Sequence, residues 1–467
     1  MCLDGTCQVK DPPDYFLCTP QSPCQGPGRC KGSVCERPAA TVLAPDWTYD
    51  AASNGEALHD LLVGPTGDVT LVGFFVPALL DAAGPLPVRA SVSGRRCMLW
   101  NDRLLCMDLP NSGQVSLLDR VTGAPRWTFD LSVARPDFAK GLTTLFMARL
   151  GVMQPDRLAA LYEAYPPGTT RDTSCRSYFL VVLDAFGKMV SAQALADPLL
   201  SECNHPHPFG VASDAAGDLY LAFGQTLNDG APLYPGAPTL LMAFSQDGVP
   251  RWRKTEAFSA GELAIVNGLL LNERSTQALR TLDGQAVASR EFPRQLGRAV
   301  ATSERLIPSP SQDEGTGAWS LEGYGLPGLA PSWTYAFQGW PGPVAPEVRL
   351  ATWVTQPGLP PETVVLGTGM TGTGPRMFAV SARDGSEVFQ CPLSGTTQPA
   401  QFLELGPDSV VMMDGAETCG DCDPPFAYSR ARFRRFAIPG LKPAEAPWPG
   451  TFGGPGHDHH EDAVRGR

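Results

Sequence analysis

The chain has 467 residues, of which 43% are hydrophobic and 18% are charged, and its formal net charge is −12. The acidic balance excludes nucleic-acid binding that depends on phosphate neutralisation, and the apolar content excludes a disordered chain. The longest apolar run, residues 71–80, is interrupted by Gly73 and Pro77 and is shorter than the ~18 residues that a membrane-spanning helix needs.

The first 35 residues contain six of the 13 cysteines, a density typical of a small disulfide-bonded module. Their Cys-x4-Cys and Cys-x5-Cys spacings, without any His, favour disulfides over zinc, because zinc ribbons usually use Cys-x2-Cys pairs. We therefore predict a disulfide-rich module at residues 1–38 that is incomplete at its start. Its cysteines are Cys2, Cys7, Cys18, Cys24, Cys30 and Cys35.

This module resembles the short Cys-rich repeats that precede larger domains in bacterial secreted proteins and lipoproteins. The resemblance implies an extracytoplasmic location, in the periplasm, at the cell surface or in the medium. No basic start with an apolar segment precedes the module, so we expect the true start and a lipid anchor to lie upstream of Met1.

A further cysteine pair lies on a predicted hairpin. A two-residue turn at residues 101–102 pairs Trp100 with Arg103 and places Cys97 opposite Cys106. A non-hydrogen-bonded pair of this kind brings the Cα atoms to ~4.5 Å, which is within reach of a disulfide. The alternative is a pair of buried thiols on adjacent strands.

The rest of the chain repeats one four-residue phrase that ends in Trp. Three of its four copies follow a turn that contains Gly, and Asp with Gly supplies the backbone angles of a tight hairpin. A second set of hairpins, flanked by β-rich apolar runs, interleaves with these turns. The tryptophans that end the phrase are Trp47, Trp127, Trp252 and Trp333.

The interleaved hairpins predict an all-β fold, an eight-bladed β-propeller with four-stranded antiparallel blades at residues 39–450. The ring would close by pairing residues 47–50 with the last strands, because an open ring leaves two unpaired edges. The alternative is seven blades, with residues 51–95 as an insertion. Residues 451–467, which contain His and Asp, are predicted to form a disordered tail.

The sequence Leu-Asp-x-x-Thr-Gly-x-x-x-Trp at residues 118–127 resembles the repeat of the PQQ-like (quinoprotein-type) propeller family. The resemblance implies that each repeat Trp packs between neighbouring blades. It points to two functions: an outer-membrane assembly factor without a cofactor, and a dehydrogenase that uses PQQ and calcium. The family's enzymes commonly carry two adjacent cysteines and a calcium set of Glu, Asn and Asp, and this chain has neither in recognisable form.

Long connections gather on one predicted face of the ring. In an up-and-down blade, the first-to-second and third-to-fourth turns share one face, here called the turn face, and the other connections share the opposite, long-loop face. Long connections on a rigid scaffold usually carry binding sites, so we predict binding at the long-loop face, whose acidic residues would attract calcium or a basic partner. The long segments are 163–177, 201–209, 225–237, 309–317, 367–375 and 415–427.

Four cysteines are also placed on the long-loop face. We expect a bridge between Cys175 and Cys203. Cys419 and Cys422 form a Cys-x-x-Cys motif that lies between strands and not at the start of a helix. This position favours a structural disulfide in the loop over a redox centre. Cys391 is left as the odd thiol.

Four side chains of the long-loop face are candidate metal ligands: His205, His207, Asp421 and Asp423. The alternative is that they belong to solvated rim loops.

We predict a non-catalytic extracytoplasmic scaffold that binds a protein or cell-envelope partner as a monomer, without a cofactor. The alternatives are the PQQ- and calcium-dependent dehydrogenase, and a glycan-binding propeller in which aromatic residues such as those at 162–165 and Tyr234 stack on sugars. No nucleophile elbow, Walker loop or His-Glu-x-x-His motif is present in the sequence.

Overall fold

The computed structural model describes most of residues 42–444 and short strands within the first 36 residues. The described ranges are 2–3, 6–7, 17–18, 23–24, 28–31, 34–36, 42–52, 58–63, 68–73, 78–81, 84–85, 95–100, 103–108, 113–120, 122–139, 144–153, 156–165, 177–201, 206–214, 216–225, 239–256, 263–272, 277–290, 299–308, 310–313, 315–337, 340, 347–354, 361–394, 402–418 and 428–444.

Seven sheets each take their strands from one stretch of chain. The first four comprise β7 (Leu58–Val63), β8 (Val69–Gly73), β9 (Ala78–Asp81) and β10 (Gly84–Pro85); β11 (Arg95–Trp100), β12 (Arg103–Asp108), β13 (Gln114–Asp119) and β14 (Pro125–Asp130); β15 (Thr144–Met153), β16 (Arg157–Tyr165), β17 (Ser177–Asp184) and β18 (Met189–Ala194); and β19 (Pro206–Ser213), β20 (Leu219–Gln225), β21 (Thr239–Phe244) and β22 (Pro250–Glu256). The next three comprise β23 (Leu263–Val266), β24 (Leu269–Asn272), β25 (Gln277–Arg280) and β26 (Ala286–Ser289); β27 (Val300–Ala301), β28 (Arg305–Ile307), β29 (Ser311–Gln312), β30 (Trp319–Gly325) and β31 (Ala330–Ala336); and β32 (Glu347–Trp353), β33 (Glu362–Thr371), β34 (Gly374–Ser381) and β35 (Glu387–Pro392).

A further sheet closes the ring with strands from both ends of the propeller. It joins β36 (Phe402–Gly406), β37 (Ser409–Thr418) and β38 (Tyr428–Ala437) to β6 (Trp47–Ala52), and Arg435 lies opposite Trp47. The predicted pairing of residues 47–50 with the last strands is therefore confirmed. Residues within 51–95 form the sheet of β7–β10, in which β7 contacts β36 and β8 contacts β11.

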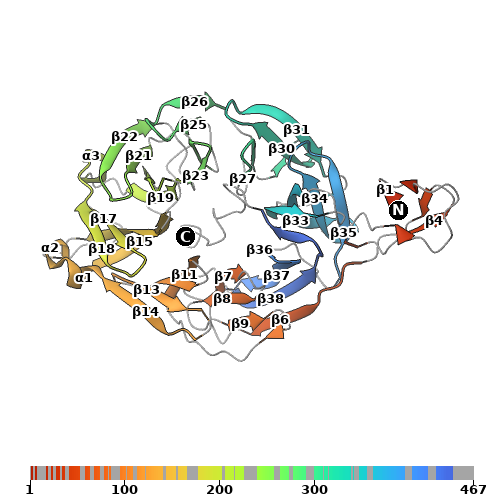
Figure 1. The fold of residues 1–467 in the computed structure, drawn as a ribbon, viewed down its shortest axis with the longest axis horizontal. Coiled ribbons are helices and arrows are strands. Elements are labelled where there is room, and N and C mark those ends of the chain that lie inside the picture. Colours follow the sequence, from red (N-terminus) through yellow and green to blue (C-terminus); the bar gives the residue numbers. More distant parts are fainter. Residues whose placement is uncertain are drawn as a thin grey trace.

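The sheets form a ring, with the first strand of each sheet toward the centre and the last at the rim (Figure 1). The chain is an all-β propeller with four-stranded antiparallel blades. Its core lies between blades, because successive side chains of a strand point to opposite faces. On β16, Leu158 and Ala160 pack with the preceding blade, whereas Ala159 and Leu161 pack with the following one.

One blade has a fifth strand at its inner edge. The strand β39 (Leu441–Pro443) pairs antiparallel with β32, so that Leu441 lies opposite Trp353. Buried Leu441 packs in the same cluster as Trp353. The described chain after β38 therefore returns along the inner edge of this blade.

Short N-terminal strands form a separate sheet, drawn outside the ring near β35 in Figure 1. Its strands are β1 (Cys2–Leu3), β2 (Thr6–Cys7), β3 (Leu17–Cys18), β4 (Gly28–Lys31) and β5 (Val34–Glu36). The register places Cys2 opposite Cys7 and Cys30 opposite Cys35.

A disulfide joins this N-terminal segment to the propeller. Cys24 is bonded to Cys391 with a Cα–Cα distance of 5.7 Å, and both side chains are buried. The expectation that Cys391 is an odd thiol was wrong, because its partner lies 367 residues away and no spacing rule connects the two. Next to this bridge, the amide of Leu43 donates to the carbonyl of Pro392 at 2.8 Å.

The predicted hairpin at residues 97–106 is present. Trp100 lies opposite Arg103 and Cys97 lies opposite Cys106, and the two sulfurs are bonded across a Cα–Cα distance of 4.0 Å. The described helices are single turns: α1 (Leu131–Ala134), α2 (Pro136–Ala139) and α3 (Pro198–Ser201). In the part of the chain that the structure describes, no helix has the length and hydropathy to cross a membrane.

Candidate functional site on the turn face

A repeated contact between neighbouring blades builds the turn face. The indole of Trp127 on β14 lies against Gly187 in the next blade, and its Nε1 donates to the carbonyl of Ala185 at 3.0 Å. Gly187 has φ +76°, and a Cβ at this position would lie 2.6 Å from the ring. Glycine is therefore required both by the backbone conformation and by the contact.

The same contact recurs at two further blades. Trp252 donates to the carbonyl of Thr281 at 2.7 Å, and Trp333 donates to that of Ala382 at 3.2 Å. Each ring again covers a glycine with positive φ, Gly284 and Gly385 respectively. The structural role predicted for the repeat Trp is confirmed at Trp127, Trp252 and Trp333; Trp47 is the half-buried first residue of β6.

Two of the blades that lack the Trp, those of β15–β18 and β23–β26, fill its place differently. Ser191 on β18 stands opposite Val182, at the register position of the other tryptophans, and the side-chain amide of Gln193 donates to the carbonyl of Gly248 in the next blade. Ala288 on β26 has the same position, and there the buried Leu329 of the next blade packs beside it.

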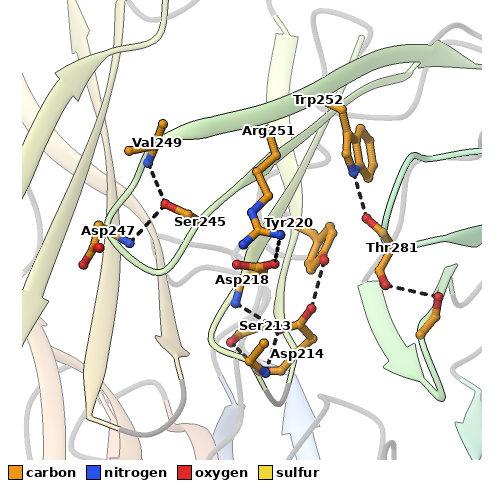
Figure 2. A network of polar contacts seen from close by, with 12 residues as sticks. Ser213, Asp214, Asp218, Tyr220, Ser245, Asp247, Val249, Arg251, Trp252 and Thr281 are labelled. Atoms are coloured by element: carbon orange, nitrogen blue, oxygen red, sulfur yellow. Dashed lines mark hydrogen bonds and ion pairs between the residues drawn. The ribbon is translucent and has the colours of Figure 1, made fainter.

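A polar network fixes the turns of the β19–β22 blade (Figure 2). One carboxylate oxygen of Asp214 accepts the amides of Ala216 at 3.0 Å and Asp218 at 2.9 Å, and the other accepts the hydroxyl of Tyr220 at 2.9 Å. Asp218 forms an ion pair with Arg251 at 2.7 Å. Both carboxylates are thus engaged in holding the turn.

The network also orients Trp252. The ring of Tyr220 lies 6.0 Å from the Trp252 ring, and both lie beside Thr281 of the next blade in Figure 2. Burial, followed by the hydrogen bond to Asp214, raises the pKa of Tyr220 far above its usual value. Burial and the charge of Asp214 raise the pKa of Asp218, against the opposing effect of Arg251. Tyr220 therefore serves as a neutral donor that links two blades.

Exposed apolar side chains lie in the turns between the third and fourth strands of three consecutive blades. Phe186 is 83% exposed, Val249 is 61% exposed and Leu282 is 78% exposed. We call these three residues the apolar arc. They lie on the turn face, because third-to-fourth turns emerge there.

The backbone of each turn in the apolar arc is held by side chains. Asp184 accepts the amides of Phe186 and Lys188, both at 2.9 Å, and Ser245 accepts the amide of Val249 at 3.1 Å. Asp283 accepts the amide of Gln285 at 3.0 Å. The arc therefore presents its apolar side chains from fixed backbone, which lowers the entropy that a partner must remove on binding.

The sequence-predicted candidates of the long-loop face fall mostly outside the described residues. His207 lies on β19, but its side chain is outside the described part. The structure likewise leaves undescribed the side chains of Cys2, Cys7, Cys18, Cys30 and Cys35. Entirely outside the described residues are His205, Asp421, Asp423, Cys175, Cys203, Cys419 and Cys422.

Three described parts of the long-loop face differ from the sequence expectation. Glu163, expected on a loop, is buried on β16 and accepts the hydroxyl of Tyr165 at 2.7 Å. Asp313 closes a tight turn by accepting the hydroxyl and the amide of Thr316, both at 2.7 Å, and these hydrogen bonds lower its pKa. Residues 367–375 continue β33 and β34 as a paired hairpin, in which Thr371 lies opposite Gly374.

The inner strands would contact any ligand on the ring axis. Glu404 on β36 is already paired with Arg349 on β32, at 2.8 Å. Among the described residues, no group of three or more His, Cys, Asp or Glu side chains could hold a metal ion, and the cysteines with described side chains are all in disulfides. These residues do not fit the PQQ and calcium that the family resemblance implies, so we derive no chemistry through them.

Comparison with solved structures finds similarity to proteins that carry different names. The chain is similar to quinohemoprotein alcohol dehydrogenase from Comamonas testosteroni, with 12% identity, 88% of this chain and 78% of that chain covered, and a TM-score of 0.48. It is similar to BamB from Moraxella catarrhalis, with 11% identity, 84% and 100% covered, and a TM-score of 0.41. It is also similar to Sqt1 from Saccharomyces cerevisiae, with 10% identity, 85% and 99% covered, and a TM-score of 0.46.

No protein-family model and no curated protein matches the sequence. At these identities the structural similarities concern the fold alone, and we assign no function from them.

Sequence reasoning missed the apolar arc, although a signal for it exists. Turn tips are usually polar, yet Phe186 directly precedes a turn glycine, Val249 directly follows one, and Leu282 precedes an Asp-Gly pair. An apolar residue beside the turn glycine in successive repeats would have pointed to the turn face.

Proposed function

We propose that this protein is a non-catalytic, extracytoplasmic scaffold that binds a protein partner through the apolar arc. The observation that carries the proposal is the exposure of three large apolar side chains on fixed turns of consecutive blades. Such side chains contribute little to the fold, and their grouping on a rigid surface is typical of a protein-binding site.

The location outside the cytoplasm belongs to the same proposal. Two described disulfides, Cys24–Cys391 and Cys97–Cys106, support an oxidising compartment, since cytosolic proteins rarely keep such bonds. We further propose that the protein acts as a monomer.

The long-loop face stays a predicted second binding surface. On that face, Val133 of α1 is 77% exposed. Val133 also offers a matched control for the apolar arc, because it is a large exposed apolar residue on the opposite face.

Photo-crosslinking tests the proposal. A photoreactive amino acid replaces Phe186 in the full chain, expressed in its native host, and the crosslinked partner is identified and purified. Affinity for that partner is then measured with Phe186→Asp, Leu282→Asp and Val133→Asp. We expect the first two changes to weaken binding by about tenfold each, as for a central apolar contact, and Val133→Asp to leave it unchanged. Wild-type affinity in both arc variants would contradict the proposal.

The dehydrogenase alternative has its own test. Purified protein is titrated with PQQ and calcium while absorbance and dye-linked alcohol oxidation are followed. We expect neither a stoichiometric quinone spectrum nor turnover at micromolar PQQ. The appearance of both would replace the scaffold proposal with an enzymatic function.

A further inference from the structure

The rim strands of the blades differ in how their outer edges are protected. An edge strand presents unpaired backbone groups, and natural proteins protect such edges with charged residues or Pro. The rim strand β22, Pro-Arg-Trp-Arg-Lys-Thr-Glu, carries both, and β14 begins Pro-Arg. In contrast, β18 reads Met-Val-Ser-Ala-Gln-Ala and has neither Pro nor charge.

The register shows which backbone groups of β18 point outward. The amide of Leu195 donates to the carbonyl of Tyr178 on β17 at 2.8 Å, so the groups of Leu195 point into the sheet. Because this direction alternates along an antiparallel strand, Ala194 and Ala192 direct their backbone groups to the rim. Nη1 of Arg135 donates to the carbonyl of Ala192 at 3.3 Å, which confirms that this carbonyl accepts hydrogen bonds from outside the sheet.

The molecule already adds an extended segment to another rim strand. At the end of β35, the amide of Leu43 donates to the carbonyl of Pro392 at 2.8 Å, and the amide of Ser394 donates to the carbonyl of Leu43 at 2.9 Å. This parallel bridge joins Leu43 to Leu393. Among the described strands, none other than β17 pairs with β18.

Apolar side chains flank the edge of β18. Val190, on the strand itself, is 40% exposed, and Phe186 of the apolar arc lies in the turn that leads into it. Apart from its backbone groups, the edge therefore offers contacts suited to apolar side chains at alternate positions of an incoming strand.

We propose that β18 is a strand-addition site, at which an extended segment of the partner protein pairs with residues 189–194 and displaces Arg135 from the Ala192 carbonyl. The inference rests on the proposed scaffold function and names the form in which the partner binds. The incoming strand supplies an amide to the Ala192 carbonyl and carbonyls to the outward amides of Ala192 and Ala194. Phe186 and Val190 contact its apolar side chains.

Two substitutions separate this site from the rest of the fold. Ala192→Pro removes an outward amide and leaves the ladder with β17 intact, because Pro is tolerated on an edge strand where the N–H faces solvent. Arg135→Ala frees the Ala192 carbonyl and also removes the ion pair with Asp137 and the contact with the Phe138 ring. We expect Ala192→Pro to weaken binding by about tenfold and Arg135→Ala to strengthen it by about threefold, since one hydrogen bond is lost or one competitor removed.

The probe is a labelled peptide of alternating Val and Thr with a Lys at each end, added to the purified full chain. Binding is followed by fluorescence anisotropy, and amide hydrogen exchange is followed by mass spectrometry. The proposal requires slower exchange in residues 189–194 on binding, together with the two opposite shifts in affinity. Unchanged affinity in Ala192→Pro would overturn it, as would peptide binding without protection of β18.

Two further outcomes have defined meanings. Protection of residues 189–194 that rises with protein concentration in the absence of peptide would overturn the proposal in favour of pairing between two copies of this chain. Loss of partner binding in Phe186→Asp and Leu282→Asp, with Ala192→Pro unaffected, would retain the scaffold function and reject the strand-addition site. Circular dichroism of each variant verifies that the fold is intact.

Discussion

The contacts between blades are of two kinds. At Trp127, Trp252 and Trp333, an indole covers a glycine of the next blade and donates one hydrogen bond to its turn. At Ser191 and Ala288 the indole is missing. Gln193 of the same strand as Ser191 donates to the next blade instead, and Leu329 of the next blade packs beside Ala288. At these five boundaries, different residues therefore make the contact between blades.

Two of the blades that lack the Trp, those of β18 and β26, also have small, uncharged rim strands. β18 and β26 contain Ala, Ser and Val with exposed Val190 and Val287, whereas β14 and β22 contain Arg. In these two blades, departure from the repeat occurs together with exposed apolar side chains. Local departures of this kind are expected where a surface has a role other than stability.

The largest expected effect comes from removing an indole. Trp333→Ala should lower the free energy of unfolding by ~3–5 kcal/mol, because it empties a buried contact between two blades and leaves the carbonyl of Ala382 without its donor. Urea unfolding followed by circular dichroism measures the change. The control, Ser191→Ala, should cost less than ~1 kcal/mol. Equal losses in both variants would show that the two kinds of contact do not differ.

The second prediction concerns the bridge between the N-terminal segment and the propeller. The double variant Cys24→Ser, Cys391→Ser should lose ~2–5 kcal/mol, since this disulfide closes a very long loop and both cysteines are buried. Thermal unfolding and peptide mapping under non-reducing conditions test it. Cys97→Ser with Cys106→Ser, which opens a loop of sequence separation 9, should cost less. The opposite order would show that the long-range bridge is strained or incompletely formed.

A third prediction isolates the glycine side of the contact. Gly187→Ala and Gly268→Ala both place Ala at a positive φ, which costs ~1–2 kcal/mol, but only the first also pushes a Cβ into the Trp127 ring. Gly187→Ala should therefore cost at least ~1 kcal/mol more than Gly268→Ala in chemical unfolding. Adding Trp127→Ala should abolish that excess. Strict additivity would argue against the contact.

The smallest expected effect is a pH dependence of stability at the boundary between the β15–β18 and β19–β22 blades. Burial alone would raise the pKa of Asp197, but hydrogen bonds from Arg253 and the amide of Leu199 outweigh it and lower the pKa. Its contribution is present above the unfolded value of ~3.9 and is lost as pH falls through the lower folded pKa. Asp197→Asn should remove about 1 kcal/mol at neutral pH and flatten the loss of stability below about pH 4.

Asp218→Asn serves as the control with the opposite sign. The pKa of Asp218 is raised by burial and by Asp214, so protonation favours the folded state as pH falls. In Asp218→Asn, stability should therefore fall with decreasing pH at least as steeply as in the wild type. A less steep fall in Asp218→Asn would contradict this assignment.

The sequence predicted local features well and long-range features poorly. Turn signals and alternation predicted the propeller, the pairing of Cys97 with Cys106, and the role of Trp127, because each depends on neighbouring residues or on one repeat. The bridge between Cys24 and Cys391 depends on where the N-terminal segment lies against the rim, which no spacing encodes. Glu163 was placed on a loop because strand ends are weakly marked, and β16 extends to Tyr165.

The candidate surface was predicted for the opposite face because loop length was taken as the signal for binding. The proposal for the turn face relies instead on the exposure of apolar side chains among the described residues, and exposure depends on packing. Phe186 and Phe179 both occur in apolar surroundings in the sequence, yet Phe179 is buried against Phe138 and Phe186 is exposed. Only the fold separates the two.

The closing sheet has a consequence for synthesis. β6 pairs with β38, which ends at Ala437. The ring therefore cannot close until β38 has left the ribosome, although β6 is synthesised early. Cys24 likewise has to avoid lasting bonds with its close neighbours until Cys391 appears. Correct maturation therefore depends on an environment in which premature disulfides are exchanged, and it can be completed only after almost the whole polypeptide has been translated.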